Sequence, residues 1–373
     1  MKKIGVAILG LGAHGGGTYQ VLLKHRELYQ KTQNVDIEIV CVLEKDSARV
    51  TGLNVPEDKI AGNIAEVVGN PDVNIVVDCL SDTALAKEYA LAALNIGKSV
   101  VISNIELYAK YSSELERVAK RHNVGLYFGA SCLGGIPAAR LLLDGLTGDS
   151  ISSVVGTAGD SEHAKYQLTV LSSLAFNSKA SYENVHTEPL GGVSEEDIKA
   201  GCSLGYKLKM LFGGKKCDDG IFLGVYPALV KKTHPLGASK NAVMLEGESA
   251  GEVVLSAGEA NALSYGSAIV SDIIYAATHV EIKYPTFSYG EKPFTQDDYS
   301  AYYLRWTGSE AGATAKIIST LSKCHIGVVE MKECGATIVM ITAKARCSAL
   351  NSAIEKINAT GLATLNASVK AVY

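Results

Sequence analysis

The residues best suited to chemistry form a glycine-rich turn near the start of the chain. An apolar run, 4–9, ends in the pattern Gly10-x-Gly12-x-x-Gly15, and a helix-like stretch, 18–28, follows at once. Gly10 permits a tight turn, Gly12 lets the backbone approach a pyrophosphate, and Gly15 lets the helix pack closely on the strand. The free N–H groups and the dipole at the helix start favour phosphate. We therefore expect a dinucleotide to contact Gly10, Gly12, Ala13, His14 and Gly15.

The strand expected next, 37–43, ends at an acidic residue, Glu44. A carboxylate at this place accepts hydrogen bonds from ribose hydroxyls, which favours NAD over NADP. Lys45 follows directly and could instead attract a 2′-phosphate. NAD is the preferred cofactor, NADP stays open, and a solvated Glu44–Lys45 pair at a strand end is the structural alternative.

These residues need a sheet to position them, and residues 1–130 provide the pattern for one. Further strands are expected at 75–80, 99–103 and 125–130, and helices at 84–97 and 112–123. Strands that alternate with helices of this length predict a Rossmann domain, a doubly wound parallel sheet that binds ligands at the strands' carboxyl ends. Asn104 and Ser131 each follow such a strand, so both are expected to face the ligand crevice.

Two further domains are expected after the Rossmann domain. Residues 131–285 read as an α+β domain for substrate binding and dimerisation. Its expected helices are 164–176, 194–212 and 264–277, and its expected strands are 221–225, 242–246 and 251–255. The last of these helices, 264–277, either belongs to this domain or packs against the Rossmann domain. A linker at 286–298 precedes a tail, 299–373, whose β-α-β-β-α-β rhythm is ferredoxin-like.

Composition excludes several classes of protein. A chain of 373 residues holds two or three domains, and a net charge of −4 gives no reason to expect nucleic acid or an anionic membrane as partner. The eight cysteines show neither C-x-x-C spacing nor a cluster with histidine, so we expect reduced thiols in the cytoplasm and no metal site. No apolar stretch is long enough to span a membrane.

Several motifs, taken in order, resemble those of the homoserine dehydrogenase family nearly end to end. Residues 130–137 (ASCLGGIP) are similar to its A-S-V-x-G-G-I-P signature, and 100–104 (VVISN) to its strand ending in T-A-N-K. Further similarity lies in 10–17, 200–211 and 234–243, and in the tail from 302. The resemblance implies reversible hydride transfer between aspartate semialdehyde and homoserine with NAD(P). It also implies a homo-oligomer and a C-terminal ACT domain, with an amino-acid effector.

The residues that would perform the family's chemistry differ here. The family lysine of T-A-N-K falls on Ile105, which cannot move a proton. The family's D-x-x-x-K pair falls on His163 and Gln167, or on Ser161 and Lys165 if the alignment slides by two residues. The family's N-G-T-x-N stretch and the acidic segment that follows it, both expected after residues 154–156, are missing from this sequence.

Replacement groups follow from these positions. His163 and Lys165 are the candidate catalytic residues, because a histidine or a lysine can exchange a proton with the reacting oxygen. Gln167, Ser131 and His234 are the candidate substrate-binding residues. Each has a structural alternative: a solvated helix position, a buried strand end, or, for His234, a turn before Pro235.

Two functions remain at this point. The first is an NAD(P)-dependent dehydrogenase of a small amino or hydroxy acid, with an altered substrate pocket. The second is a catalytically silent sensor that binds NAD(P) and an amino acid. The intact glycine turn favours the enzyme.

Overall fold

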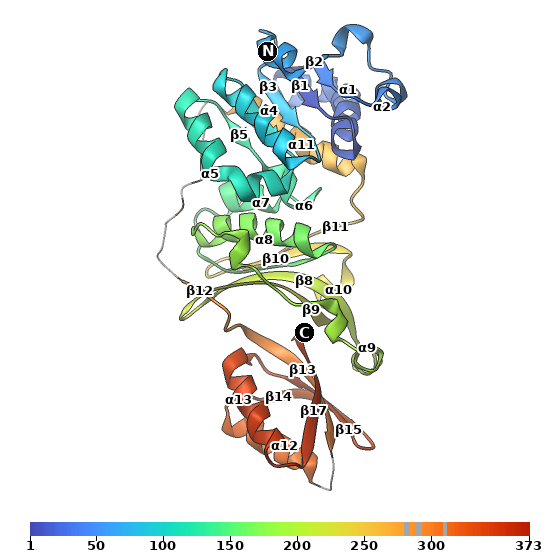
Figure 1. The fold of residues 1–373 in the computed structure, drawn as a ribbon, viewed down its shortest axis with the longest axis vertical. Helices are drawn as coiled ribbons and strands as arrows, with labels where there is room; N and C mark the ends of the chain where they lie inside the picture. Colours follow the sequence, from blue (N-terminus) through green and yellow to red (C-terminus); the bar gives the residue numbers. More distant parts are fainter. Residues whose placement is uncertain (280–283, 286, 288–292, 309–311) are drawn as a thin grey trace. The chain divides into compact units, whose positions relative to one another are not determined.

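The computed structural model describes residues 1–279, 284–285, 287, 293–308 and 312–373. The chain divides into two compact units, shown in Figure 1. Unit 1 contains Met1–Gly148, Thr169–Tyr182 and Ala257–Ser288, and unit 2 contains Asp149–Leu168, Glu183–Ser256 and Tyr289–Tyr373.

Unit 1 is built on a parallel sheet with the order β2-β1-β3-β4-β5. The strands are β1 (Lys2–Leu9), β2 (Val35–Leu43), β3 (Ile75–Asp78), β4 (Ser99–Ile102) and β5 (Leu126–Tyr127). The helices that alternate with them are α1 (Ala13–Gln33), α2 (Ser47–Gly52), α3 (Ile64–Gly69), α4 (Thr83–Asn95) and α5 (Ile105–His122). The predicted parallel Rossmann-like sheet is confirmed. Strand order reverses beside β1, and ligands of such sheets bind at that point, at the carboxyl ends of the strands.

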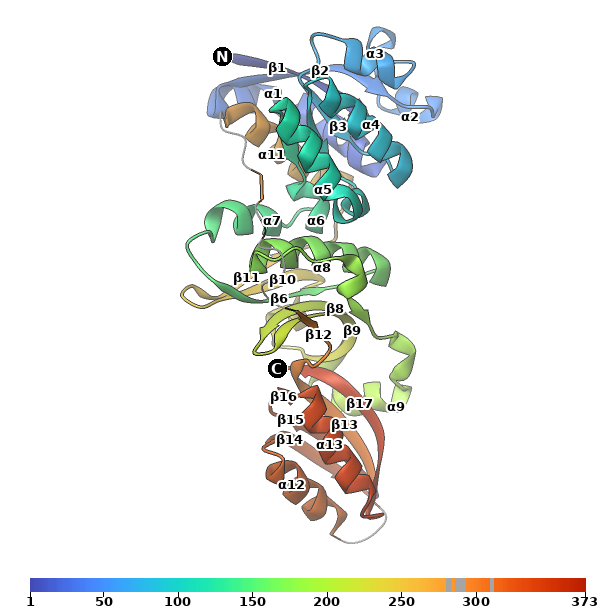
Figure 2. The same cartoon turned by 60° about the vertical axis from the view of Figure 1, so that its left-hand side comes forward.

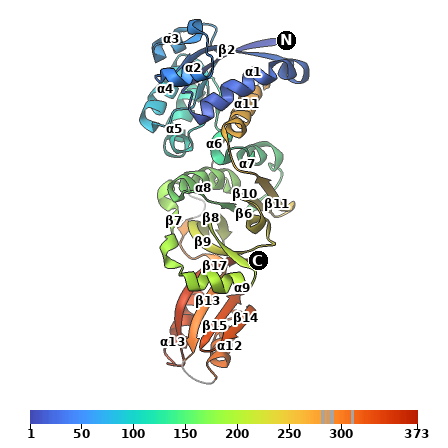
Figure 3. The same cartoon turned by 90° about the vertical axis from the view of Figure 1, so that its right-hand side faces the viewer.

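Helix α11 (Ala262–Thr278) completes the core of unit 1 by packing against α1 (Figures 2 and 3). The two helices approach so closely that a Cβ on Gly17 would lie 1.8 Å from the carbonyl oxygen of Ala262. Ile269 and Ile273 of α11 then join the apolar cluster formed by the sheet and α1. Unit 1 also holds α6 (Gly129–Leu133), α7 (Ala138–Arg140) and a π-helical turn (Leu141–Gly145).

Unit 2 is built on a mixed sheet with the order β11-β10-β6-β8-β9-β17-β13-β15-β14. Its middle strands are β6 (Ile151–Thr157), β8 (Tyr206–Cys217), β9 (Gly220–Lys231), β10 (Asn241–Gly247) and β11 (Gly251–Ala257). Two short strands, β7 (His186–Thr187) and β12 (Phe294–Thr295), pair with β9. The helices here are α9 (Glu195–Ser203), α10 (Pro235–Ala238) and the start of α8 (Ser161–Phe176).

The tail follows the predicted β-α-β-β-α-β order. It consists of β13 (Tyr299–Gly308), α12 (Ala313–Lys323), β14 (Val328–Cys334), β15 (Thr337–Thr342), β16 (Ala345–Arg346), α13 (Cys347–Asn358) and β17 (Ala363–Val372). The order β17-β13-β15-β14 with antiparallel neighbours gives the ferredoxin-like topology. Strand β17 also pairs in parallel with β9 at Lys370–Val372, which joins the tail sheet to the middle strands.

One predicted helix is wrong. The range 194–212 is not a single helix, because α9 ends at Ser203 and β8 begins at Tyr206. Gly205 lies between them with φ +85°, a left-handed conformation that ends helices. The predicted cap is correct, since Ser194 Oγ accepts a hydrogen bond from the N–H of Asp197. Lys207 and Lys209 therefore lie on a strand rather than on a helix face.

Part of the expected linker at 286–298 lies outside the described residues, and within the described part Phe294–Thr295 forms β12. No helix among the described residues is long and apolar enough to cross a membrane. Across the same residues, no group of three or more His, Cys, Asp or Glu side chains is arranged to hold a metal ion.

Candidate functional site

The glycine turn between β1 and α1 is tightly packed at Gly10 and at Gly15. Gly10 has φ +84°, and a Cβ there would lie 3.0 Å from the carbonyl oxygen of Cys79. A Cβ on Gly15 would lie 1.8 Å from the carbonyl oxygen of Gly10. Gly12 is the N-cap residue of α1, no side chain caps that helix start, and Ala13 is its first residue. The backbone geometry is thus that of a turn that leaves a helix start open to phosphate.

Glu44 follows β2 and holds the glycine turn. Its carboxylate accepts hydrogen bonds from the N–H groups of Leu11 (2.6 Å), Lys45 (2.8 Å) and Asp46 (2.9 Å). Desolvation acts to raise the pKa of Glu44, but these backbone hydrogen bonds outweigh it and lower the pKa. The carboxylate therefore stays ionised beside the turn. The side chain of Lys45 is exposed.

Arg49, on the short helix α2, is a residue that sequence reasoning missed. Its Nη1 lies 3.5 Å from Glu44 Oε2 and 3.7 Å from the position of a Cβ on Gly12. A cation thus lies between the carboxylate and the glycine turn. The available signal was a basic residue five positions after the acid at the strand end.

His14 and the ends of β3 and β4 form a polar cluster beside the turn. His14 Nδ1 lies 3.2 Å from Ser103 Oγ, and the His14 ring lies 4.1 Å from the ring of Tyr265. Burial raises the pKa of the Cys79 thiol to about 12. Cys79 is therefore a neutral thiol that packs under the turn.

Asn104 contacts protein groups on two loops. Its Oδ1 accepts a hydrogen bond from the N–H of Leu107 and so caps α5. Its Nδ2 donates to the carbonyl of Leu80 at 3.2 Å and to Thr83 Oγ1 at 3.3 Å. The side chain therefore ties the β3–α4 loop to the β4–α5 loop, and Ile105, which follows it, is buried.

Asp78, at the carboxyl end of β3, is a second residue that sequence reasoning missed. Its Oδ1 accepts a hydrogen bond from the N–H of Leu80, while Oδ2 is buried and has no hydrogen-bond partner among the described residues. Burial raises the pKa of this carboxyl to about 7. The signal in the sequence was a polar residue at the end of an apolar strand. The raised pKa of Asp78 follows from the complete burial of its side chain.

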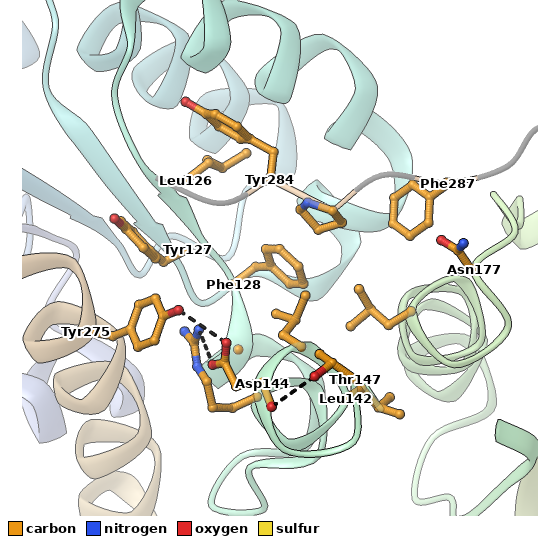
Figure 4. Close-up of a pocket in the computed structure, with 15 residues that line it drawn as sticks. Leu126, Tyr127, Phe128, Leu142, Asp144, Thr147, Asn177, Tyr275, Tyr284 and Phe287 are labelled. Carbon is orange, nitrogen blue, oxygen red and sulfur yellow. Dashed lines mark hydrogen bonds and ion pairs between the residues drawn. The ribbon is translucent and has the colours of Figure 1, made fainter. Parts of the chain in front are cut away.

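Ser131 lies in α6, and the first residue of that helix, Gly129, lines an aromatic pocket of about 240 Å³ shown in Figure 4. Its hydroxyl donates to the carbonyl of Phe128 and is buried. In the pocket wall, Arg140 bonds Asp272 at 2.8 Å and lies 3.7 Å from the Tyr275 ring. These charged groups satisfy one another, so the pocket wall is a structural cluster rather than an open polar site.

In unit 2, the first turns of α8 carry the predicted catalytic side chains. Asp160 caps this helix by accepting a hydrogen bond from the N–H of His163 at 2.8 Å. His163 and Gln167 are four residues apart and share one helix face. Lys165 Nζ lies 3.7 Å from Glu162 Oε1. Partial desolvation by neighbouring protein groups lowers the pKa of His163 from its ordinary 6.5, although the side chain still reaches solvent, and Asp160 opposes this shift more weakly. The imidazole is therefore mainly neutral at neutral pH.

His234 has a structural contact. Its Nδ1 accepts a hydrogen bond from the N–H of Leu236 and so caps the short helix α10. This is the turn-forming role expected as the alternative to substrate binding. The ring also lines a cavity within unit 2.

Comparison with known proteins decides the family. The family model for homoserine dehydrogenase matches residues 160–274, and the model for the NAD-binding domain of homoserine dehydrogenase matches residues 10–129. The two matches together span more than half of the chain. The chain belongs to the homoserine dehydrogenase family.

Individual homoserine dehydrogenases match along most of the chain. The enzyme from Neisseria gonorrhoeae is 27% identical over 420 aligned positions that cover 96% of each chain. The one from Bacillus subtilis is 26% identical and covers 87% of this chain and 86% of its own. The crystal structure of a homoserine dehydrogenase from Thiobacillus denitrificans superposes with a TM-score of 0.86 at 25% identity, covering 100% of this chain and 98% of that one.

Membership of the homoserine dehydrogenase family makes this chain an NAD(P)-dependent dehydrogenase. The comparisons give no support to the silent alternative. Since this chain has only 373 residues, the 420-position alignment must contain gaps in it.

Proposed function

We propose that this protein transfers a hydride between NAD(P) and a small amino or hydroxy acid, with L-homoserine and aspartate semialdehyde as the expected pair. The observation that carries the proposal is the glycine turn, in which a Cβ on Gly15 would lie 1.8 Å from the backbone of Gly10. A turn this tight and open to a helix start has the form of a dinucleotide site. Homoserine is the substrate in the names of the matched relatives, and oxidation of its primary hydroxyl gives aspartate semialdehyde.

The residues at the turn fit a dinucleotide. Gly10, Gly12 and Gly15, with Ala13 and His14, would hold the pyrophosphate and its surroundings. Asn104 would act beside them by holding two loops together at the strand ends. Bound NAD(P) supplies a hydride acceptor or donor.

We infer a preference for NAD. The ionised Glu44 lies at the end of β2, where ribose hydroxyls bind and a 2′-phosphate would be repelled. Arg49, and the exposed Lys45, would act in the opposite direction by attracting that phosphate. We expect the Glu44 carboxylate to outweigh the two cations in setting the cofactor preference, because three backbone N–H groups fix it in place.

We infer that His163 exchanges the proton of the substrate hydroxyl. A neutral imidazole accepts that proton as the hydride leaves the carbon, which then becomes a carbonyl. Lys165 is the second proton-transfer candidate, and Gln167 is placed to orient a carboxylate through hydrogen bonds. Ile105 supplies no proton at the family's lysine position.

The remaining candidates have supporting roles in this proposal. Ser131 and His234 would shape the substrate pocket through the backbone that they hold. The direct experiment measures reduction of NAD and of NADP with L-homoserine, and then repeats it with His163→Ala and Lys165→Met. Loss of turnover in one variant identifies the proton-transfer group.

We also infer that the tail is an ACT-like regulatory module with an amino-acid effector and that the chain forms a homo-oligomer. The ferredoxin-like strand order supports the module. We place the domains at 1–130, 131–285 and 299–373, with a linker at 286–298. Limited proteolysis tests these boundaries, and sedimentation analysis tests the assembly.

A further inference from the structure

A cluster of three polar and aromatic side chains lies beside the glycine turn of unit 1. His14 is the second residue of α1, Ser103 directly follows β4, and Tyr265 is the fourth residue of α11. His14 Nδ1 lies 3.2 Å from Ser103 Oγ, and the ring centres of His14 and Tyr265 are 4.1 Å apart. Three segments that are far apart in the sequence therefore meet at one side of the turn.

Both rings of this cluster are held by protein contacts. Ser103 is buried against one side of the His14 ring, and His14 and Tyr265 are half-buried. Tyr265 packs on the glycine after α6, since a Cβ on Gly134 would lie 2.8 Å from Tyr265 Cε1. Helix α11, which carries Tyr265, packs along α1 (Figure 3). The imidazole and the phenol are thus in place before a ligand binds, which lowers the entropy cost of contacting one.

The hydroxyl that contacts His14 is a departure from the family motif. Where residues 100–104 resemble the strand that ends in T-A-N-K, Asn104 falls on the asparagine and Ser103 on the alanine. Alanine has no polar side-chain atom, so the contact with His14 Nδ1 depends on the serine that this chain has instead.

The strand order places this cluster and Glu44 on opposite sides of the glycine turn. Glu44 follows β2 and Ser103 follows β4, and the order β2-β1-β3-β4 separates these strands by three spacings, about 14 Å across the sheet. In a dinucleotide site of this kind, the acidic residue after the second strand binds the adenosine ribose and the glycine turn binds the pyrophosphate. The half of the dinucleotide beyond the pyrophosphate then extends towards β3 and β4. That half is the nicotinamide with its ribose.

The side chains of the cluster suit a nicotinamide better than a phosphate. The carboxamide of nicotinamide has a carbonyl acceptor and an NH₂ donor, and a neutral imidazole and a phenol each offer a donor and an acceptor. Among the described residues, the Tyr265 hydroxyl forms no hydrogen bond, so it is available to a ligand. Aromatic rings also pack well against a flat heterocycle. None of the three side chains is a lysine or an arginine, the residues that bind phosphate most strongly.

We propose that His14 and Tyr265 contact the nicotinamide ring of the cofactor and hydrogen-bond its carboxamide, and that Ser103 positions the His14 imidazole for this contact. The inference rests on the proposed function, because it requires NAD(P) at the glycine turn. A held carboxamide stops the ring from rotating about its bond to the ribose, so that one face stays turned to the substrate.

Calorimetric titration of the full chain with NADH and with ADP-ribose tests the proposal. ADP-ribose has the adenosine, the pyrophosphate and the second ribose of NADH but lacks the nicotinamide. We expect His14→Ala and Tyr265→Phe each to weaken NADH binding about fivefold or more, and to change ADP-ribose binding by less than about twofold. An equal loss for both ligands would place His14 at the pyrophosphate, and unchanged NADH binding in both variants would make the cluster purely structural. Either result overturns the proposal.

A double variant tests the positioning role of Ser103. Ser103→Ala should weaken NADH binding in the parent protein but not in the His14→Ala background, because its effect passes through the imidazole. An equal effect in both backgrounds overturns this role. His122→Ala, at an exposed histidine that ends α5, is the control and leaves both affinities unchanged.

The parent protein separates this inference from the proposed function. A parent that binds neither NADH nor ADP-ribose would refute the proposed cofactor site and this inference together. A parent that binds both ligands, with variants that bind them equally well, would refute only this inference.

Discussion

The glycine turn of unit 1 and the start of α8 in unit 2 carry the two sets of candidate site residues, and they differ in how they are built. The turn is fixed by backbone contacts, such as the hydrogen bond from the N–H of Leu11 to Glu44 at 2.6 Å. The start of α8 presents His163, Lys165 and Gln167 as side chains on a helix whose first turn Asp160 caps. Backbone geometry tolerates few sequences, whereas a proton-transfer group can be supplied by another residue on the same surface. Under the proposal that His163 takes the role of the proton-transfer group, this accounts for a kept cofactor motif beside a changed catalytic residue.

The largest expected effect comes from filling the turn. In Gly15→Val, the new side chain meets the carbonyl oxygen of Gly10, so we expect cofactor binding to be lost and the free energy of unfolding to fall by about 3 kcal/mol. Fluorescence titration with NADH and thermal unfolding measure both. Gly69→Ala, where a Cβ meets nothing within 4 Å, is the control. A Gly15→Val protein that binds NADH normally would show that the cofactor lies elsewhere.

The next effect concerns the start of α8. We expect His163→Ala to lower kcat by about 10²-fold or more, because a general base is lost. With the parent protein, kcat/KM for oxidation should fall as pH drops through a pKa below 6.5, since a protonated imidazole cannot accept a proton. The variant should lose this part of the pH profile, whereas His186→Ala, at an exposed strand residue, keeps it. An unchanged kcat and profile in His163→Ala would assign proton transfer to another group.

The third prediction concerns how the free energy of unfolding depends on the charge of the buried Asp78 carboxyl. Its folded-state pKa of about 7 exceeds the ordinary 3.8, so the folded protein binds this proton more tightly than the unfolded chain does. Its contribution to stability therefore falls as pH rises between these values. We expect Asp78→Asn to unfold with a free energy about 2–4 kcal/mol higher than the parent near pH 8, and similar near pH 4.

Denaturant unfolding at both pH values measures this difference. Asp58→Asn, at an exposed residue, is the control. Parallel curves for the parent and Asp78→Asn at all pH values would mean that the Asp78 carboxyl is solvated.

The smallest expected effect concerns cofactor choice. Glu44→Gln keeps an acceptor for the N–H of Leu11 but removes the charge, so we expect kcat/KM with NADP to rise about tenfold relative to NAD. Arg49→Ala should shift the ratio in the opposite direction, and Lys45→Ala should change it less. Steady-state kinetics with both cofactors measures the ratio. An identical ratio in the parent, Glu44→Gln and Arg49→Ala would place the 2′-phosphate away from both residues.

Features set by local sequence patterns could be predicted from the sequence, whereas features set by contacts in the folded chain could not. The β1–α1 turn and the parallel sheet around it were predictable, because glycine spacing and strand–helix alternation are local patterns. The range 194–212 was misread because its apolar residues fit a helix, while the left-handed Gly205 ended that helix. Arg49 and Asp78 were missed, since the contact of Arg49 with the turn and the burial of the Asp78 carboxyl arise only in the folded chain.

The most direct test is absorbance at the nicotinamide band, with purified protein, L-homoserine, and NAD or NADP in parallel. We predict reduction of the cofactor, faster with NAD, abolished in Gly15→Val and strongly reduced in His163→Ala. Folded protein that binds NADH but neither oxidises L-homoserine nor reduces aspartate semialdehyde would contradict the proposed substrate pair.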